Sequence, residues 1–120
     1  MKKNIIQEKS FDFALRIVDL SRKLRFEEKE FILSNQLLKS GTSVGANVEE
    51  AIGGFSRKEF SSKLGIAYKE SRETRYWLRL LYESKFIPKE DYIDLIKECN
   101  QIIKILSSIL LTLKQDSKPS

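Results

Sequence analysis

Residues 56–85 read SRKEFSSKLGIAYKESRETRYWLRLLYESK, and this stretch decides the fold. Ser56 followed three residues later by Glu59 forms a capping box, a pattern typical of the start of an α-helix. Apolar and small residues then recur three or four apart, which places them on one helical face: Phe60, Leu64, Ala67, Ser71, Thr74, Leu78 and Leu81 or Tyr82. We therefore predict one long helix over residues 56–85 with a continuous core-facing stripe.

Three further segments show the same helical period. They are residues 10–25 with Ser10 as N-cap, residues 28–52 ended by a left-handed Gly53-Gly54, and residues 88–114 opened by Pro88. Because the connections are short, sequential helices are expected to be antiparallel. The sequence thus predicts an all-α, antiparallel up-and-down four-helix bundle in one domain spanning residues 1–120, with a frayed tail at 115–120.

Two glycines, Gly41 and Gly45, lie four apart on the core face of the second predicted helix. Their missing side chains favour an unusually close approach of another helix. The alternative is a break at residues 41–43, which would give two shorter helices.

Three of the predicted helices, residues 10–25, 56–85 and 88–114, carry more apolar surface than one stripe can bury. The first has two stripes side by side, one of Phe11, Ala14, Leu15 and Val18 and the other of Phe13, Ile17, Leu20 and Leu24. The last has a seam of Tyr92, Ile96, Cys99, Ile103, Leu106, Leu110 and Leu113, with Ile93, Leu95, Ile102, Ile105, Ile109 and Leu111 outside it. Helices that are apolar around much of their circumference contact more than one neighbour, which favours self-association.

The composition excludes several classes of enzyme. The chain has 120 residues, no His and one Cys, so a His-ligated zinc site and Ser-His or Cys-His catalysis are excluded. Cys99 is expected to be a small core residue. Four acids are the only ones positioned to cluster between helices: Glu49, Glu50, Glu70 and Glu73. Since the di-iron bundle pattern needs His, salt bridging is the favoured interpretation, with Arg57 a candidate partner of Glu49 and Glu50; we predict no catalytic residue, no metal and no cofactor.

Charge and hydropathy indicate the cellular compartment of the protein and the class of molecule it binds. The net charge is +5, with the basic excess in residues 1–27 and 55–85, so polyanions are candidate partners. The basic N-terminus is not followed by an apolar run, and the longest uncharged apolar stretch, residues 105–113, is about half the length that spans a bilayer. We therefore expect a cytoplasmic protein.

A basic stripe on the third predicted helix is the clearest functional signal. At 100° per residue, five side chains fall within an arc of about 120°: Lys58, Lys69, Arg72, Arg75 and Arg79. Cations at this spacing can contact successive nucleic-acid phosphates, with Tyr68 or Tyr76 at the margins to stack on a base. The alternative is an ordinary solvated face in which Arg72 and Arg75 pair with acids.

A second face of the same helix carries Ile66, Trp77 and Leu80, which point away from the core stripe. A large Trp outside the core indicates an interface, so these three residues are predicted to lie between subunits of a homo-oligomer or under another protein partner. A protein-interaction scaffold with no direct nucleic-acid role is therefore the second hypothesis.

Three stretches carry a resemblance to a known family: SVGANVEEA at 43–51, SRKEF at 56–60 and IAYKESRETRYWL at 66–78. In this order and spacing they resemble the small bacterial four-helix-bundle proteins linked to intervening sequences of 23S ribosomal RNA genes. The likeness extends from Phe11 to about Lys114. It implies a bundle that assembles as a pentameric ring, with no known enzymatic activity.

A related branch of that family is the accessory protein of diversity-generating retroelements. The resemblance to it implies a basic pentameric barrel that binds nucleic acid and a reverse transcriptase, so an accessory-subunit role is part of the second hypothesis. Two positions depart from the family pattern: Gly54 stands where many members carry Arg, and Ala51 where many carry Gly. The first removes a charge from a candidate nucleic-acid surface, and the second affects local packing.

Overall fold

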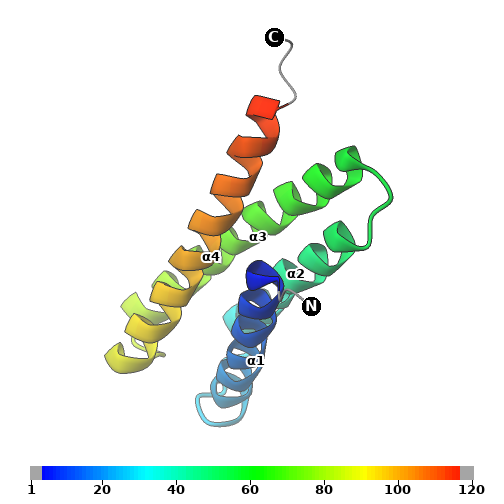
Figure 1. Ribbon diagram of the computed structural model, residues 1–120. Helices are drawn as coiled ribbons and strands as arrows, with labels where there is room; N and C mark the ends of the chain where they lie inside the picture. The colour runs from blue at the N-terminus through cyan, green and yellow to red at the C-terminus, as the bar shows by residue number, and fades with distance from the viewer. Residues whose placement is uncertain (1–3, 117–120) are drawn as a thin grey trace.

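The computed structural model describes residues 4–116, which form four long helices joined by short connections (Figure 1). The helices are α1 (Ile5–Phe26), α2 (Ile32–Ile52), α3 (Arg57–Glu83) and α4 (Lys89–Asp116). Both α1 and α3 pack against α2 and α4, whereas the described backbones of the diagonal pairs, α1 with α3 and α2 with α4, do not approach closely. This arrangement confirms the predicted antiparallel four-helix bundle. The molecule measures 54 × 26 × 23 Å, and within residues 4–116 no helix combines the length and apolar character needed to cross a membrane.

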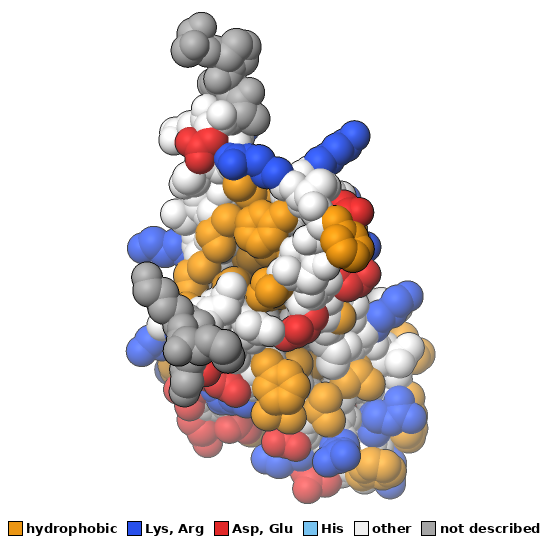
Figure 2. Space-filling model, turned by 45° about the vertical axis from the view of Figure 1, so that its right-hand side comes forward, with side chains coloured by type: hydrophobic (Ala, Val, Ile, Leu, Met, Phe, Trp, Pro, Cys, Tyr) orange, Lys and Arg blue, Asp and Glu red, His pale blue; other side chains and the backbone are white. Residues whose placement is uncertain are grey.

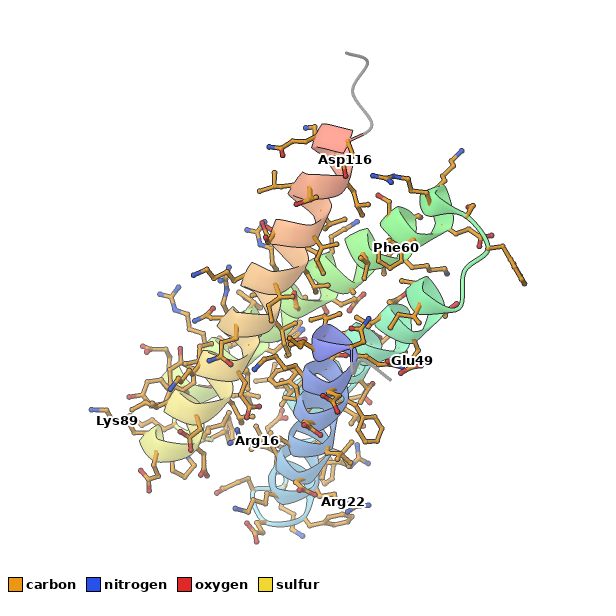
Figure 3. The ribbon with its side chains drawn as sticks, viewed as in Figure 1. Arg16, Arg22, Glu49, Phe60, Lys89 and Asp116 are labelled. Atoms are coloured by element: carbon orange, nitrogen blue, oxygen red, sulfur yellow. The ribbon has the colours of Figure 1, made fainter. Side chains whose placement is uncertain are left out.

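The core-facing stripe of α3 follows the sequence prediction closely. Its buried residues are Leu64, Ala67, Ser71, Thr74, Leu78 and Leu81. Phe60, at the beginning of the stripe, is partly buried and packs against the same hydrophobic core (Figure 3). The buried face of α3 could be predicted from one stripe because Arg, Lys and Glu occupy most of the remaining circumference of the helix.

In α1, only one of the two predicted stripes is in the core. The structure buries Phe13, Ile17, Leu20 and Leu24, together with Ile6, Ser10 and Ser21. Phe11 and Leu15 of the other stripe are 61% and 52% exposed. Hydrophobic side chains accordingly remain at the surface, as Figure 2 shows for one face of the molecule.

The buried face of α4 is wider than the predicted seam. Cys99, Ile103 and Leu106 are buried as expected, but so are Leu95 and Ile102, which were predicted to lie outside the seam. The reason is that α4 packs against α3 on one side and α1 on the other. On the α1 side, the Arg16 guanidinium donates to the Glu98 carboxylate; Figure 3 labels Arg16 where α1 faces α4.

Close packing of α1 on α2 depends on the two glycines. A Cβ on Gly41 would lie 2.7 Å from Cγ2 of Ile17, and one on Gly45 would lie 3.3 Å from the backbone oxygen of Ser10. The predicted close approach is therefore confirmed. Because α2 is continuous over Ile32–Ile52, the alternative break at residues 41–43 is wrong.

Two predicted helix starts are corrected. α1 begins at Ile5 rather than Ser10, because Asn4 is its N-cap and accepts a hydrogen bond from the Gln7 amide at 3.1 Å. α2 begins at Ile32 rather than residue 28. Its first amides donate to the carboxylate of Glu30, at 2.9 Å from Leu33 and 2.7 Å from Ser34. The Glu30 side chain, in the connection between α1 and α2, thus caps the N-terminus of α2.

Lysines, not glycines, adopt the left-handed conformation at helix ends. Lys29 has a φ of 55° and Lys85 a φ of 71°, and each follows the end of a helix, α1 and α3 respectively. Gly53 does follow the end of α2, but its φ is −82°, so the predicted left-handed glycine is wrong.

The starts of α3 and α4 agree with the sequence prediction to within one residue. Ser56 is the N-cap of α3 and accepts from the Glu59 amide at 3.0 Å, while the Glu59 carboxylate accepts from the Phe55 amide at 2.8 Å. Pro88 immediately precedes α4. α4 continues to Asp116, so residues 115 and 116 of the predicted frayed tail are helical, and residues 117–120 lie outside the described part of the chain.

Candidate nucleic-acid interface

A groove of about 770 Å³ lies between α3 and α4. Four cationic side chains of α3 line it: Lys69, Arg72, Arg75 and Arg79. Their spacing of three, three and four residues places them on one side of the helix, next to the core stripe. Tyr92 and Ile96 line it from α4. We call this feature the basic groove.

The contacts of the four cations decide whether the basic groove can take up an anion. Within residues 4–116, none of them forms an ion pair. Arg75 donates from Nη1 to Oδ1 of Asn100 at 3.1 Å, and the Arg72 guanidinium lies 5.8 Å from the centre of the Tyr68 ring. The alternative in which Arg72 and Arg75 pair with acids is therefore not what the structure contains.

Lys58, the fifth residue of the predicted basic stripe, lies outside the basic groove. It borders a separate depression of about 750 Å³ near the start of α3, with Arg57 beside it and Leu110 and Leu113 of α4 opposite. Lys58 precedes Lys69 by 11 residues, or about 16 Å along the helix axis. The structure thus brings four of the five predicted basic residues together.

Two tyrosines and one acid complete the lining of the basic groove. Tyr76 is 57% exposed and follows Arg72 by four residues. Tyr92, at the beginning of α4, was missed as a site residue because its position in the predicted seam marked it as core. Tyr68, the other tyrosine considered, does not line the groove but packs on the core. With the Glu73 carboxylate, the four cations leave a net charge of +3.

Glu73 is tied to its neighbours on α3. Its Oε2 accepts a hydrogen bond from Nε1 of Trp77 at 3.1 Å. Partial burial, and then the Glu73 carboxylate, raise the pKa of Glu70, while Lys39 and Lys69 oppose the shift. The acid in the basic groove is therefore held by the Trp77 side chain rather than by one of the four cations.

The three residues predicted at an oligomer interface differ in exposure. Ile66 is 38% exposed, whereas Trp77 and Leu80 are half-buried. Trp77 packs against the core of its own chain, and its ring meets Tyr76 edge to face, with centroids 5.0 Å apart. Contacts within the chain thus account for the partial burial of Trp77.

The acids considered as metal ligands have other partners. Glu49 accepts from Nε2 of Gln7 at 2.7 Å, and Glu50 pairs with Lys63 at 3.2 Å. Arg57, the partner suggested by the sequence, instead pairs with Asp116 at 3.3 Å; Figure 3 labels Glu49 and Asp116. In the described range, 4–116, no three potential metal ligands of the His, Cys, Asp or Glu type group together.

The fold and the basic groove define a small all-helical bundle protein with a cationic surface, and comparison with known proteins identifies its family. The chain belongs to the 23S rRNA-intervening sequence protein family, whose model matches residues 2–108. It is similar to a protein of unknown function from the S23 ribosomal protein family of Bacteroides thetaiotaomicron VPI-5482. The two share 47% sequence identity and a TM-score of 0.86, over 88% of this chain and 97% of the other. No curated protein matches the chain.

Proposed function

We propose that this protein is a non-enzymatic, homo-oligomeric bundle of the cytoplasm that binds the phosphates of RNA or DNA through the basic groove. The observation that carries the proposal is the convergence of Lys69, Arg72, Arg75 and Arg79 on one groove without an ion pair within residues 4–116. A guanidinium presents a planar fork of donors that matches a phosphate, and a cation outside any ion pair binds a phosphate without first breaking a salt bridge. Lys58 adds to the positive field from the end of the same helix.

Assembly into a homo-oligomer strengthens the binding of a polyanion that we propose. One subunit carries a net charge of only +5, and its field is modest. Several basic grooves on one oligomer bind a long polyanion with avidity that a single groove lacks. We assign the contact between subunits to the face of Ile66, Trp77 and Leu80, which is next to the groove on α3; a pentamer is the assembly that the family resemblance implies.

The names of the family and of the similar structure support RNA as the first polyanion to test. The first refers to 23S rRNA and the second to a ribosomal protein family. Purified protein, freed of nucleic acid, is titrated against labelled structured RNA and duplex DNA over a salt series. If each cation of the basic groove neutralises one phosphate, log K for duplex DNA falls with log salt at a slope of up to about −3.6 per subunit.

Charge reversal locates the binding surface. We expect the triple variant Arg72→Glu, Arg75→Glu, Arg79→Glu to lose binding, because three phosphate contacts become repulsive. The matched control reverses three exposed cations outside the groove: Arg22, Lys23 and Lys104. Both variants change the net charge by the same amount, and circular dichroism checks that both stay helical. Equal binding by the two variants contradicts the proposal.

A protein-interaction scaffold or accessory subunit is the second candidate, and a specific observation favours it. Phe11 and Leu15 of α1 are exposed by more than half although they form an apolar stripe at helical spacing. Such a stripe is typical of a surface covered by another protein. In this function the partner is a protein, for example a reverse transcriptase, and the charge-reversal variant keeps its partner.

A further inference from the structure

The basic groove contains aromatic rings as well as cations, and this combination indicates a particular class of ligand. Resting on the proposed function, we infer that the groove binds single-stranded nucleic acid, with an unpaired base stacked on Tyr92 or Tyr76 and the adjoining phosphates on the arginines. Base stacking on aromatic rings beside a cationic track is the chemistry by which proteins hold single strands.

Tyr92 is held in place for such stacking. Its ring lies parallel to that of Tyr82, with centroids 4.2 Å apart and planes 5° apart. Tyr92 lines the basic groove, whereas Tyr82 is not one of its lining residues, so Tyr82 fixes the orientation of the Tyr92 ring without itself lining the groove. Tyr92 also packs against the hydrophobic core. A base entering the groove extends a stack that already exists, and little side-chain freedom is lost.

Tyr76 lies between the arginines on α3. It follows Arg72 by four residues and precedes Arg79 by three, and it is 57% exposed. Its ring contacts Trp77 edge to face, and Trp77 is in turn hydrogen-bonded to Glu73. This chain of contacts orients an otherwise exposed ring. Phosphates bound by Arg72 and Arg79 would flank a base on Tyr76.

The aromatic lining of the groove favours a single strand over a duplex. The groove volume of about 770 Å³ is in the range of small-molecule sites, so one or two unpaired nucleotides fit within it. From Lys69 to Arg79 the cations extend about 15 Å along α3, enough for several phosphates of one strand. In a duplex the bases are stacked inside, so Tyr76 and Tyr92 would have no base to contact.

The test separates base contacts from phosphate contacts. Fluorescence anisotropy compares four labelled probes of ten nucleotides: oligo(U), oligo(dT), an abasic deoxyribose strand and a duplex of ten base pairs. We expect the single strands with bases to bind about 5- to 150-fold more tightly than the abasic strand, the range for stacking of one base. Oligo(U) and oligo(dT) distinguish RNA from DNA.

Each outcome has a definite meaning. Equal binding of the abasic strand, or tighter binding of the duplex, overturns the single-strand inference and leaves phosphate binding intact. Absence of binding by all four probes at low salt overturns the inference and the proposed function together. Tighter binding of the base-bearing strands supports both.

Tyrosine variants test the stacking platform itself. Tyr92→Leu and Tyr76→Ala are expected to reduce the preference for base-bearing over abasic strands, and Tyr92→Phe to retain it. Tyr82→Leu is the comparison variant: it removes the ring that supports Tyr92 but leaves the groove lining unchanged, so it should lower the preference less than Tyr92→Leu. If Tyr82→Leu loses the preference as completely as Tyr92→Leu, or if neither Tyr92→Leu nor Tyr76→Ala lowers it, stacking in the groove is overturned.

Discussion

Cys99, the single thiol of the chain, shows how the core controls one residue's chemistry. It is fully buried, and its Sγ donates to the backbone oxygen of Ser71 at 3.2 Å. Burial raises the pKa of the Cys99 thiol to about 12, although Arg75 opposes the shift. The thiolate is the reactive form of cysteine, so Cys99 is protonated and inert at neutral pH.

This shift predicts a pH dependence of stability. The pKa is about 12 in the folded chain and near 9.0 in the unfolded chain, so the stabilising contribution is fully present below pH 9 and declines between pH 9 and 12. Urea unfolding of the wild type and of Cys99→Ala is compared at each pH. We expect the difference between their free energies of unfolding to decrease by about 1 kcal/mol from pH 9 to pH 10. Parallel stability curves would show that the thiol titrates normally in the folded protein.

At the residue scale, the sequence predicted burial well only where one stripe of a helix is apolar. The stripe of α3 was clear because charged residues surround it. In α1, Phe11 and Phe13 have the same hydrophobicity, and only the packing of neighbouring helices decides which one is buried. The lining of the basic groove shows the same limit. The four cations were predicted from their spacing on one helix. Tyr92 belongs to another helix, so its place in the groove could be recognised only from the tertiary fold.

At the scale of the element, the glycines of α2 and α3 differ in what surrounds them. A Cβ on Gly41 would collide with the buried side chain of Ile17, with atoms at 2.7 and 2.9 Å. A Cβ on Gly65 of α3 would meet nothing within 4 Å. Both glycines lie inside helices, where Gly is less favourable than Ala by about 1 kcal/mol.

We expect the same substitution to have opposite signs at these two positions. Gly65→Ala should stabilise the protein by about 0.5–1 kcal/mol through helix propensity alone. At Gly41 the collision with Ile17 costs about 1–3 kcal/mol, which exceeds that gain, so Gly41→Ala should destabilise by roughly 1 kcal/mol. Urea denaturation measures both. Stabilisation by Gly41→Ala would mean that α1 moves freely away from α2.

The start of α3 was predictable because a capping box of two side chains marks it, whereas the single local cap that Asn4 makes at α1 was missed. Ser56 and Glu59 were recognised because their hydrogen bonds join residues three or four apart. The start of α2 was missed because Glu30, which is not a typical N-cap residue, accepts the first amides. Lys29 was missed as a left-handed residue because Lys seldom adopts this conformation.

At the scale of the whole molecule, the bundle is elongated and incompletely covered. Its radius of gyration is 15.4 Å, against about 13.6 Å for a compact domain of this length. Exposed apolar side chains occur on α1 at Phe11 and Leu15, on α3 at Ile66 and on α4 at Leu111. Surfaces of this kind are expected to be covered in an oligomer.

We predict that the protein self-associates and that Ile66 lies in the contact. Light scattering should give a multiple of the 14.0 kDa chain mass, and X-ray scattering a radius of gyration above 15.4 Å. Ile66→Asp should shift the mass toward 14.0 kDa, since a buried unpaired charge disfavours association. Ile66 is chosen because it is exposed in the single chain, whereas Trp77 and Leu80 are half-buried.

The control for this prediction is Ile93→Asp, at an apolar position of α4 that is 49% exposed and outside the proposed contact. It should leave the assembly unchanged. A wild-type mass of 14.0 kDa, or equal masses for the two variants, would refute the placement of the interface.

Trp77 has one further consequence because it is the only tryptophan of the chain. Its indole N–H donates to Glu73, and its ring meets Tyr76, so both of its polar and aromatic neighbours line the basic groove. Indole emission depends on local polarity and on nearby charges. Trp77 is therefore an intrinsic fluorophore beside the groove, and ligand binding can be followed by tryptophan emission without an added dye.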